Sequence, residues 1–132
     1  MLMERILIID DNDIVQMVLQ KILVREGYSV DIATNGKEGL ELIDRTPYDL
    51  IITDLMMPYA NGFEIISKIR QHPKGERVPI IIISAVTQEH SITEGFQLGA
   101  DDYLKKPITG KELVIRVKRL LDARRVTTPI HV

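Results

Sequence analysis

The chain has 132 residues, enough for one domain with a single hydrophobic core, and its 45% hydrophobic and 27% charged residues are ordinary for a globular protein. It contains no cysteine, which excludes disulfides, thiolate metal sites and cysteine nucleophiles. Its net charge of −2 argues against binding nucleic acid through bulk electrostatics, and its longest apolar runs are too short to span a bilayer. With no signal peptide visible, we expect a cytoplasmic protein that binds neither nucleic acid nor a membrane.

Strand and helix patterns alternate along the chain. Short hydrophobic runs predict five strands, over residues 5–10, 28–33, 48–54, 78–84 and 102–105. Apolar residues at helical spacing predict helices over residues 13–26, from a cap at Asn35 to near residue 46, after Gly62, over 87–98 and over 111–125. Asn12 or Asp13 can cap the first helix, and Asn61–Gly62 is expected as a turn and a cap.

Five strand–helix units joined by short loops imply an α/β fold, with a doubly wound parallel sheet and helices on both faces. The run over residues 28–33 alternates polar and apolar residues, so we expect it at an edge of the sheet. One domain is therefore expected over residues 1–125. Residues 126–132 have no periodicity and are expected to form a tail or the start of a linker.

Polar residues stand at the ends of four of these strands. Asp10 and Asp11 follow the first strand, Asp54 ends the third, Ser84 ends the fourth, and Lys106 follows the fifth. Because ligands bind beyond the carboxyl ends of strands in an open α/β sheet, these side chains are expected at one rim. The sequence therefore predicts a pocket that can hold a hard metal ion and a phosphoryl group.

The acids of this rim indicate which ion it would take. Asp10, Asp11 and Asp54 bring three like charges together, which costs free energy unless a cation or a proton compensates them. All-oxygen ligands at a solvent-accessible rim favour Mg²⁺. A carboxylate can also attack phosphorus to give an aspartyl phosphate, a transfer for which Lys106 can supply charge and Ser84 a hydrogen bond. Lys106 precedes Pro107, so the bond between them is a candidate for the cis form.

These residues resemble the motifs of the receiver domain of bacterial-type two-component response regulators, over about residues 4 to 123. The motifs are Asp10-Asp11, Asp54-Leu55-Met56-Met57-Pro58, Ser84-Ala85, Gly99-Ala100-Asp101-Asp102-Tyr103 and Lys106-Pro107. The resemblance implies a flavodoxin-like three-layer fold, in which a five-stranded parallel sheet has the order 2-1-3-4-5.

The resemblance also implies roles for the acids. Asp54 would be the phosphoacceptor. Asp11 would bind Mg²⁺ directly, and Asp10 largely through water. The backbone carbonyl of Met56 would be a further metal ligand.

The remaining implied roles concern switching and partners. Lys106 matches the lysine of the family's site, Ser84 its hydroxyl switch position, and Tyr103 the aromatic residue that changes rotamer on activation. The phosphoryl donor would be a phosphohistidine on a sensor histidine kinase or a phosphotransfer protein. The output surface would comprise the fourth helix, the fifth strand and the fifth helix, with Ile115 outside the inward stripe of that last helix. The basic residues of the last helix are also consistent with a solvated face, and the pattern leaves homodimerisation open.

One departure from the family concerns the lifetime of the phosphorylated state. Met56 and Val86 occupy positions that tend to modulate dephosphorylation in the family, and both are apolar here. Neither can orient an attacking water by hydrogen bonding, so we expect slow self-dephosphorylation.

Two other functions were weighed. Asp11-Asn12-Asp13-Ile14-Val15 matches the motif of haloacid-dehalogenase-like phosphatases, in which Asp11 would be the nucleophile and Asp13 the general acid. The helix pattern that starts at Asp13 leaves no room for that family's flap, and the chain is too short for its cap domain. A receiver-like interaction domain that is never phosphorylated is the other alternative. Asp101 and Asp102 are interpreted as surface acids at the far end of the fifth strand.

Overall fold

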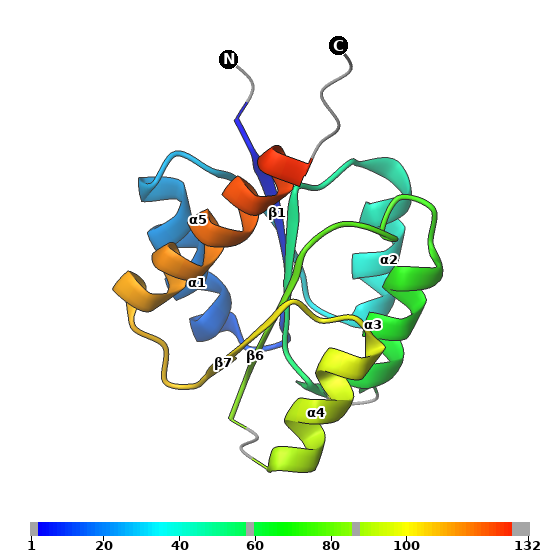
Figure 1. The fold of residues 1–132 in the computed structure, drawn as a ribbon. Coiled ribbons are helices and arrows are strands. Elements are labelled where there is room, and N and C mark those ends of the chain that lie inside the picture. Colours follow the sequence, from blue (N-terminus) through cyan, green and yellow to red (C-terminus); the bar gives the residue numbers. More distant parts are fainter. Residues whose placement is uncertain (1–2, 58–59, 86–87, 128–132) are drawn as a thin grey trace.

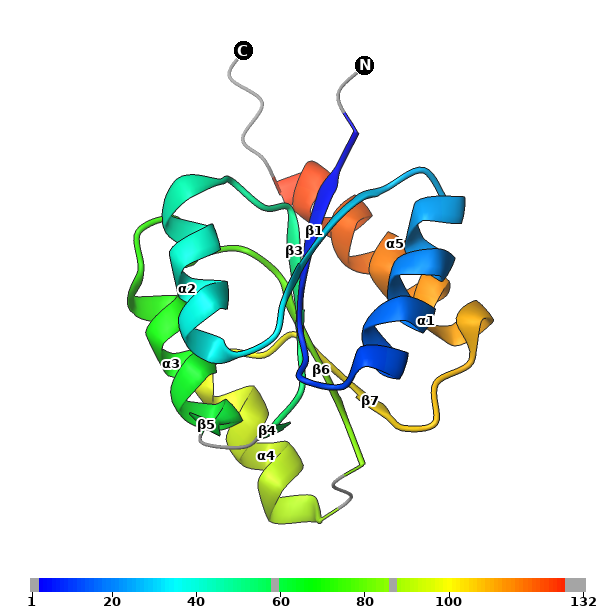
Figure 2. The same ribbon diagram turned by 180° about the vertical axis from the view of Figure 1, so that it is seen from behind.

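The computed structural model describes residues 3–57, 60–85 and 88–127. Five parallel strands form the central sheet in the order β2-β1-β3-β6-β7 (Figures 1 and 2). These strands are β1 (Arg5–Ile9), β2 (Ser29–Ala33), β3 (Leu50–Thr53), β6 (Ile80–Ser84) and β7 (Asp102–Lys105). Because β6 and β7 are the fourth and fifth strands of this sheet, the predicted order 2-1-3-4-5 is confirmed.

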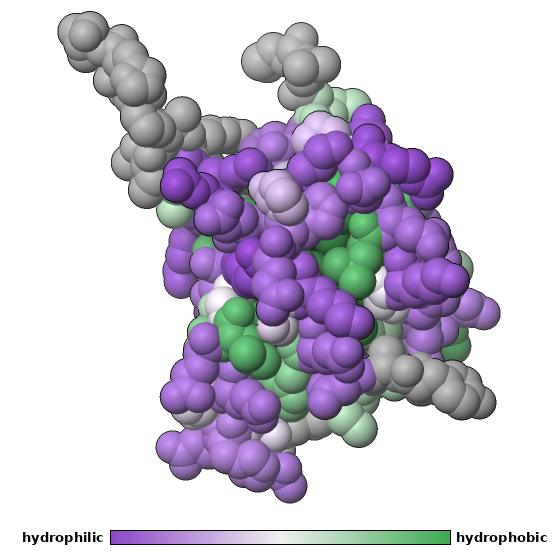
Figure 3. All heavy atoms as spheres, turned by 90° about the vertical axis from the view of Figure 1, so that its right-hand side faces the viewer, coloured by the Kyte–Doolittle hydropathy of each residue, from purple (hydrophilic) through white to green (hydrophobic). Residues whose placement is uncertain are grey.

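Helices cover both faces of the sheet, as the alternating pattern predicted. Figure 1 shows α1 (Asp13–Arg25) and α5 (Gly110–Thr127) on one side of the sheet. The helices α2 (Gly36–Arg45), α3 (Gly62–Gln71) and α4 (Glu89–Leu98) lie on the other side. In Figure 3, which views that second side, polar residues cover most of the surface around small apolar patches. The helices thus turn their apolar stripes to the sheet and their polar residues to solvent.

The sheet divides the core into two layers. Along β1, Ile6 and Ile8 pack in the cluster beneath α1 and α5, whereas Leu7 and Ile9 pack in the cluster beneath α2 and α3. Successive residues of a strand point to opposite faces, and because helices cover both faces, all four side chains are fully buried. The residues of β2 are mostly half-buried, which confirms its predicted place at an edge.

Side chains of asparagine fix the starts of three helices. Asn12 accepts hydrogen bonds from the backbone N–H groups of Ile14 and Val15, so it, rather than Asp13, caps α1. Asn35 caps α2, and Asn61 caps α3, as predicted. These oxygens satisfy backbone donors that have no partner inside the helix.

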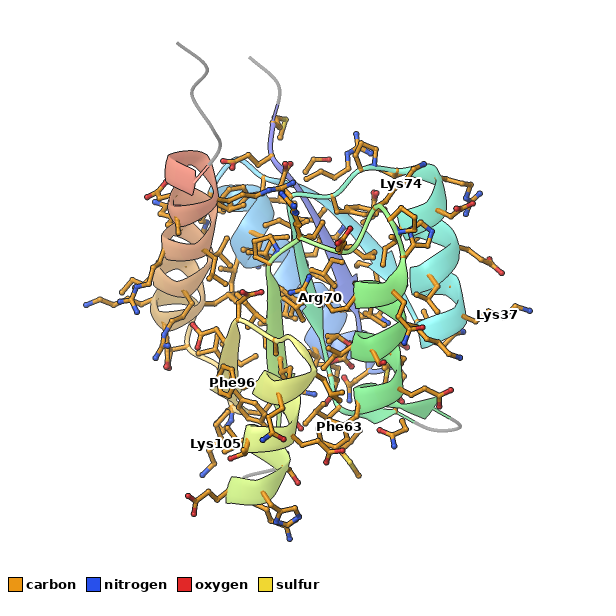
Figure 4. All side chains as sticks on the ribbon, turned by 45° about the vertical axis from the view of Figure 1, so that its right-hand side comes forward. Lys37, Phe63, Arg70, Lys74, Phe96 and Lys105 are labelled. Carbon is orange, nitrogen blue, oxygen red and sulfur yellow. The ribbon has the colours of Figure 1, made fainter. Side chains whose placement is uncertain are left out.

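The two ends of α4 are held differently. At its C-terminus Gly99 adopts a left-handed conformation with φ 118°, and its carbonyl accepts bonds from Arg70 Nε at 3.1 Å and from Arg70 Nη2 at 2.6 Å. Arg70 projects from α3, as Figure 4 shows. At the N-terminus of α4, Gln88 makes no capping hydrogen bond with its side chain. The helix is therefore secured more firmly at its C-terminal end.

Several element boundaries differ from the predictions. A two-residue antiparallel pair, β4 (Met56–Met57) with β5 (Ala60–Asn61), was not predicted, and it includes Asn61, which was expected in a turn. The strand β6 starts at Ile80 rather than at residue 78, since Pro79 has no N–H to donate to a neighbouring strand. The helix α5 runs to Thr127, two residues into the expected tail. Val86 lies outside the described residues.

None of the helices within residues 3–57, 60–85 and 88–127 has the length and apolar character needed to cross a membrane.

Candidate functional site

The carboxyl ends of four strands bring the predicted site residues to the lower rim of the sheet in Figure 1. Three backbone hydrogen bonds extend the sheet pairing one residue beyond the strands. They run from Asp10 N to Ala33 O at 3.1 Å, from Asp54 N to Ile9 O at 3.1 Å and from Lys106 N to Ser84 O at 2.9 Å. The sheet itself thus fixes the backbone of each of these site residues.

Asp10, Asp11 and Asp54 form one acidic cluster. A carboxylate oxygen from each residue lies within 4.8 Å of the other two. Asp10 and Asp54 are buried, at 2% and 5% exposed, whereas Asp11 is exposed to solvent. The cluster is therefore closed on the side of the sheet and open to solvent on the side of Asp11, so an ion or ligand can enter from that side.

Lys106 reaches into this cluster from the other side. Its Nζ lies 2.8 Å from Asp54 Oδ2 and 3.3 Å from Asp10 Oδ2, and its side chain is 22% exposed. The bond between Lys106 and Pro107 is cis, as the sequence suggested. The ammonium group of Lys106 therefore contacts both buried acids, Asp10 and Asp54, but does not contact the third acid, Asp11.

Burial and neighbouring charges perturb the titration of Asp10 and Lys106. Burial raises the pKa of Asp10, and the charge of Asp54 adds to this effect, against the Asn12 N–H bond and Lys106, which act to lower it. Burial by itself would lower the pKa of Lys106. The hydrogen bond to Asp54 and the charges of Asp54 and Asp10 outweigh it, so that the pKa of Lys106 is raised. The acids thus hold a firmly protonated lysine and still carry excess negative charge.

The two oxygens of the Asp54 carboxylate have different partners. Oδ1 accepts a hydrogen bond from the backbone N–H of Met56 at 3.1 Å, and Oδ2 contacts Lys106. The side chain of Met56 is 66% exposed. An incoming group near Asp54 would therefore meet an apolar, solvent-facing neighbour.

Ser84 and Tyr103 are in direct contact. Ser84, the last residue of β6, is fully buried, and its hydroxyl lies close enough to Tyr103 of β7 to affect the titration of that side chain. Burial raises the pKa of Tyr103, although the Ser84 hydroxyl acts to lower it. The hydroxyl that was predicted to sense a phosphoryl group and the aromatic ring that was predicted to move are thus coupled.

One residue of the site was missed in the sequence. Gln16 of α1 is buried, and its Nε2 donates to the backbone carbonyl of Asp10 at 2.5 Å. The sequence feature that could have revealed Gln16 is the position of a polar amide on the buried stripe of α1, which it shares with Leu19 and Leu23.

Asp101 and Asp102 lie away from the site, at the opposite end of β7 from Lys106, as predicted. Asp101 is exposed, as expected of a surface acid, but both acids also make structural contacts. Asp101 Oδ2 accepts bonds from Arg70 Nη2 at 2.9 Å and from the N–H of Ile80 at 2.8 Å. Asp102, whose side chain is 14% exposed, pairs with Arg116 at 2.9 Å.

Comparison with known proteins decides between the functions considered. The family model described as the response regulator receiver domain matches residues 6–118. The chain belongs to this family. Receiver domains are phosphoryl-accepting signalling modules rather than turnover enzymes, and this one has the acidic pocket formed by Asp10, Asp11 and Asp54. The phosphatase hypothesis is wrong, and α1 does begin at Asp13, with no room for a flap.

Individual relatives agree with this assignment. The receiver domain is 41% identical to the transcriptional regulatory protein SrrA of Staphylococcus aureus over 123 residues, 93% of this chain and 50% of that protein. The chain thus spans about half the length of the curated relatives it matches.

Solved structures match over nearly their whole length. The chemotaxis protein CheY4 of Vibrio cholerae is 28% identical with a TM-score of 0.87, and the match covers 90% of this chain and 99% of that one. The receiver domain of the sensor histidine kinase PA1611 from Pseudomonas aeruginosa is 30% identical with a TM-score of 0.84, over 92% of this chain and 99% of that one. That structure has a magnesium ion coordinated in its active-site cleft.

Proposed function

We propose that Asp54 accepts a phosphoryl group from a phosphohistidine of a sensor histidine kinase or phosphotransfer protein, in a Mg²⁺-dependent reaction. The observation that carries the proposal is the contact of Lys106 Nζ with Asp54 Oδ2 at 2.8 Å, at the edge of the three-acid cluster. It joins a nucleophilic carboxylate, a cation and a group of oxygen ligands within one pocket. Phosphoryl transfer needs this combination of positioning and charge neutralisation.

The charges of the pocket fit Mg²⁺. Three ionised acids beside one ammonium leave two uncompensated negative charges, which one Mg²⁺ ion would balance. Carboxylate oxygens are its preferred protein ligands, and Mg²⁺ usually retains several waters, which suits a cluster open to solvent at Asp11. Asp10, Asp11, Asp54 and the backbone carbonyl of Met56 would hold the ion. When bound, it would neutralise charge on the phosphoryl oxygens. The magnesium ion of the PA1611 receiver supports the assignment.

The residues of the chain then have distinct tasks. A carboxylate oxygen of Asp54 attacks phosphorus, the bond between phosphorus and the donor imidazole breaks, and the imidazole nitrogen keeps the electron pair. The N–H of Met56 orients the carboxylate through Oδ1. Lys106 stabilises the negative charge of the phosphoryl oxygens, because its raised pKa keeps it protonated throughout the neutral range.

The phosphoryl group would change the shape of a distant surface through Ser84 and Tyr103. Ser84 donates its hydroxyl hydrogen to a phosphoryl oxygen, and Tyr103, whose hydroxyl interacts with that of Ser84, moves with it. The surface made by α4, β7 and α5 then binds an output partner, or the output part of a longer chain. The equilibrium between the inactive and active conformations shifts only by the difference in free energy between the contacts that the phosphoryl group makes in each.

A groove of about 470 Å³ beside the site suits the phosphoryl donor. In it, Ile14 and Val18 of α1 are 67% and 42% exposed. Lys106 lines both the groove and the pocket, so that an apolar helix face lying in the groove would bring its histidine close to Asp54. The groove is lined by Ile14, Val15, Val18, Leu19, Lys106, Pro107 and Ile108.

The proposed function also implies an extent, a location and possible partners for the domain. The receiver unit would extend to Thr127, where α5 ends. Such a domain works in the cytoplasm, where kinase domains use ATP, and it binds neither nucleic acid nor membrane itself. Homodimerisation would use the output surface, where Ile115 is 46% exposed.

The test is the intact mass of the protein after incubation with acetyl phosphate and Mg²⁺, beside an Asp54→Asn variant. We expect one added phosphoryl group that requires Mg²⁺ and is absent from the variant. An adduct that survives Asp54→Asn would place the acceptor elsewhere. A folded protein that takes no phosphoryl group from acetyl phosphate or from a phosphohistidine donor would favour an interaction domain that is never phosphorylated.

A further inference from the structure

The backbone carbonyl of Asp10 has a partner with no task in the proposed reaction. Gln16 Nε2 donates to this carbonyl at 2.5 Å, from a side chain that is only 9% exposed. The backbone N–H of Gln16 donates to the carbonyl of the cap residue Asn12 at 3.0 Å, which places it in the first turn of α1. The side chain thus reaches back from α1 to the end of β1.

Asp10 and Asp11 are held in different ways. The carboxylate of Asp10 is fixed directly, because Oδ1 accepts from Asn12 N at 2.9 Å and Oδ2 contacts Lys106. The carboxylate of Asp11 is exposed, and within residues 3–57, 60–85 and 88–127 no side chain or backbone group bonds to it. Its direction therefore depends on the backbone that carries it, and the Asp10 carbonyl belongs to the peptide plane that joins the two acids.

We propose that Gln16 is a positioning residue of the metal site. By holding the carbonyl of Asp10, it fixes the peptide plane from which the Asp11 carboxylate projects toward the cluster, and it raises the affinity of the site for a divalent cation. Partners that orient metal ligands through hydrogen bonds commonly change affinity by about 10- to 100-fold. This inference rests on the proposed function, since it concerns the same Mg²⁺ site.

A packing role alone would not call for an amide at this position. Gln16 shares the buried stripe of α1 with Leu19 and Leu23, where an apolar side chain would avoid the cost of removing an amide from water. A residue that served only to fill space would affect the stability of the fold and leave the affinity for Mg²⁺ unchanged. The two roles therefore predict different measurements.

The test compares two matched variants on the same helix. Gln16→Met keeps the length of the side chain and a good helix propensity but removes the donor. Gln20→Met makes the same change one turn later, at an exposed position. The dissociation constant for Mg²⁺ is measured by isothermal titration calorimetry. The rate of phosphorylation by acetyl phosphate is then followed against Mg²⁺ concentration.

We expect Gln16→Met to raise the dissociation constant about 10-fold and Gln20→Met to leave it unchanged. The half-saturating Mg²⁺ concentration for phosphorylation should rise by the same factor, while the rate at saturating Mg²⁺ stays near that of the parent protein. A Gln16→Met protein that loses thermal stability but binds Mg²⁺ like the parent would overturn the proposal.

A second measurement does not depend on the folding of a variant. In NMR spectra of the parent protein, the side-chain amide protons of Gln16 should exchange with water more slowly than those of Gln20, both without and with Mg²⁺. Equal exchange rates would overturn the proposal. A parent protein that binds no Mg²⁺ would overturn the proposed function itself, so the two failures are distinguished by the parent alone.

Discussion

Lys106 Nζ lies 2.8 Å from Asp54 Oδ2, although the two residues are 52 positions apart in the sequence. The pair joins the end of β7 to the end of β3, across the intervening strand β6. It therefore connects the proposed nucleophile with the half of the sheet that carries Ser84 and Tyr103. A change of charge at Asp54 therefore changes its electrostatic interaction with Lys106, which lies on the output side of the sheet.

Replacing Lys106 with methionine should destabilise the protein in the absence of Mg²⁺. The change leaves Asp10 and Asp54 buried with no ammonium group beside them, which we expect to cost about 3 kcal/mol. Urea unfolding in EDTA measures this, and Lys105→Met, at the exposed neighbour, is the control. Equal stability of the two variants would contradict the role of Lys106 as the countercharge.

The stability difference between the parent and Lys106→Met should also depend on pH. Because the folded state raises the pKa of Lys106 above its ordinary value of 10.5, the stabilisation is fully present below pH 10.5. It is lost as the pH rises further, through the pKa of the folded protein. Unfolding curves from pH 7 to 11.5 would check this, and a difference that instead grew above pH 10.5 would reverse the assigned sign.

Asp10→Asn should stabilise the metal-free protein and weaken its binding of Mg²⁺. Burial and the charge of Asp54 raise the pKa of Asp10, so ionising this carboxyl costs the folded state more free energy than it costs the unfolded chain. Removing the charge should therefore raise the free energy of unfolding in EDTA. Chemical unfolding with EDTA and with Mg²⁺ measures both effects. Asp13→Asn, outside the cluster, should give no gain in stability.

Ser84→Ala should separate phosphorylation from switching. Asp54 and Lys106 remain in place, so acetyl phosphate should still add one phosphoryl group. The link between the phosphoryl oxygens and Tyr103 is lost, so the change in hydrogen exchange of α4 and β7 on phosphorylation should fall by more than half. Mass-resolved hydrogen exchange measures it. An unchanged response in Ser84→Ala would place the coupling in other residues.

Met56→Asn should shorten the lifetime of the phosphorylated protein. The side chain of Met56 is 66% exposed beside Asp54 and cannot bind water by hydrogen bonding, whereas an amide can position one for attack. We expect hydrolysis to accelerate about 10-fold, which corresponds to about 1.4 kcal/mol in the barrier. Decay of the phosphorylated mass measures it, with Met56→Leu as the control that keeps the slow rate.

The strand ends could be predicted from the sequence because strong hydrophobic runs stop directly at charged or hydroxyl residues. The chain topology then forces Asp10, Asp54, Ser84 and Lys106 to one rim. The contact of Gln16 with Asp10 could not be predicted, since it depends on how α1 leaves the sheet. The short pair of β4 and β5 was missed because two-residue strands carry no periodicity. The partners of Asp101 and Asp102 lie on helices whose rotation no local pattern reveals.

The unequal ends of α4 give that helix the mechanics of a lever. Arg70 joins the carbonyl of Gly99 to α3 and also donates to the carbonyls of Gly75 at 2.9 Å and Val78 at 2.5 Å, so this end of α4 is held both to α3 and to the connection between α3 and β6. The opposite end starts at Gln88 without a side-chain cap, a few residues after Ser84. A displacement of Ser84 would thus move the uncapped end of α4 most and the end at Gly99 least, over the ten residues of the helix.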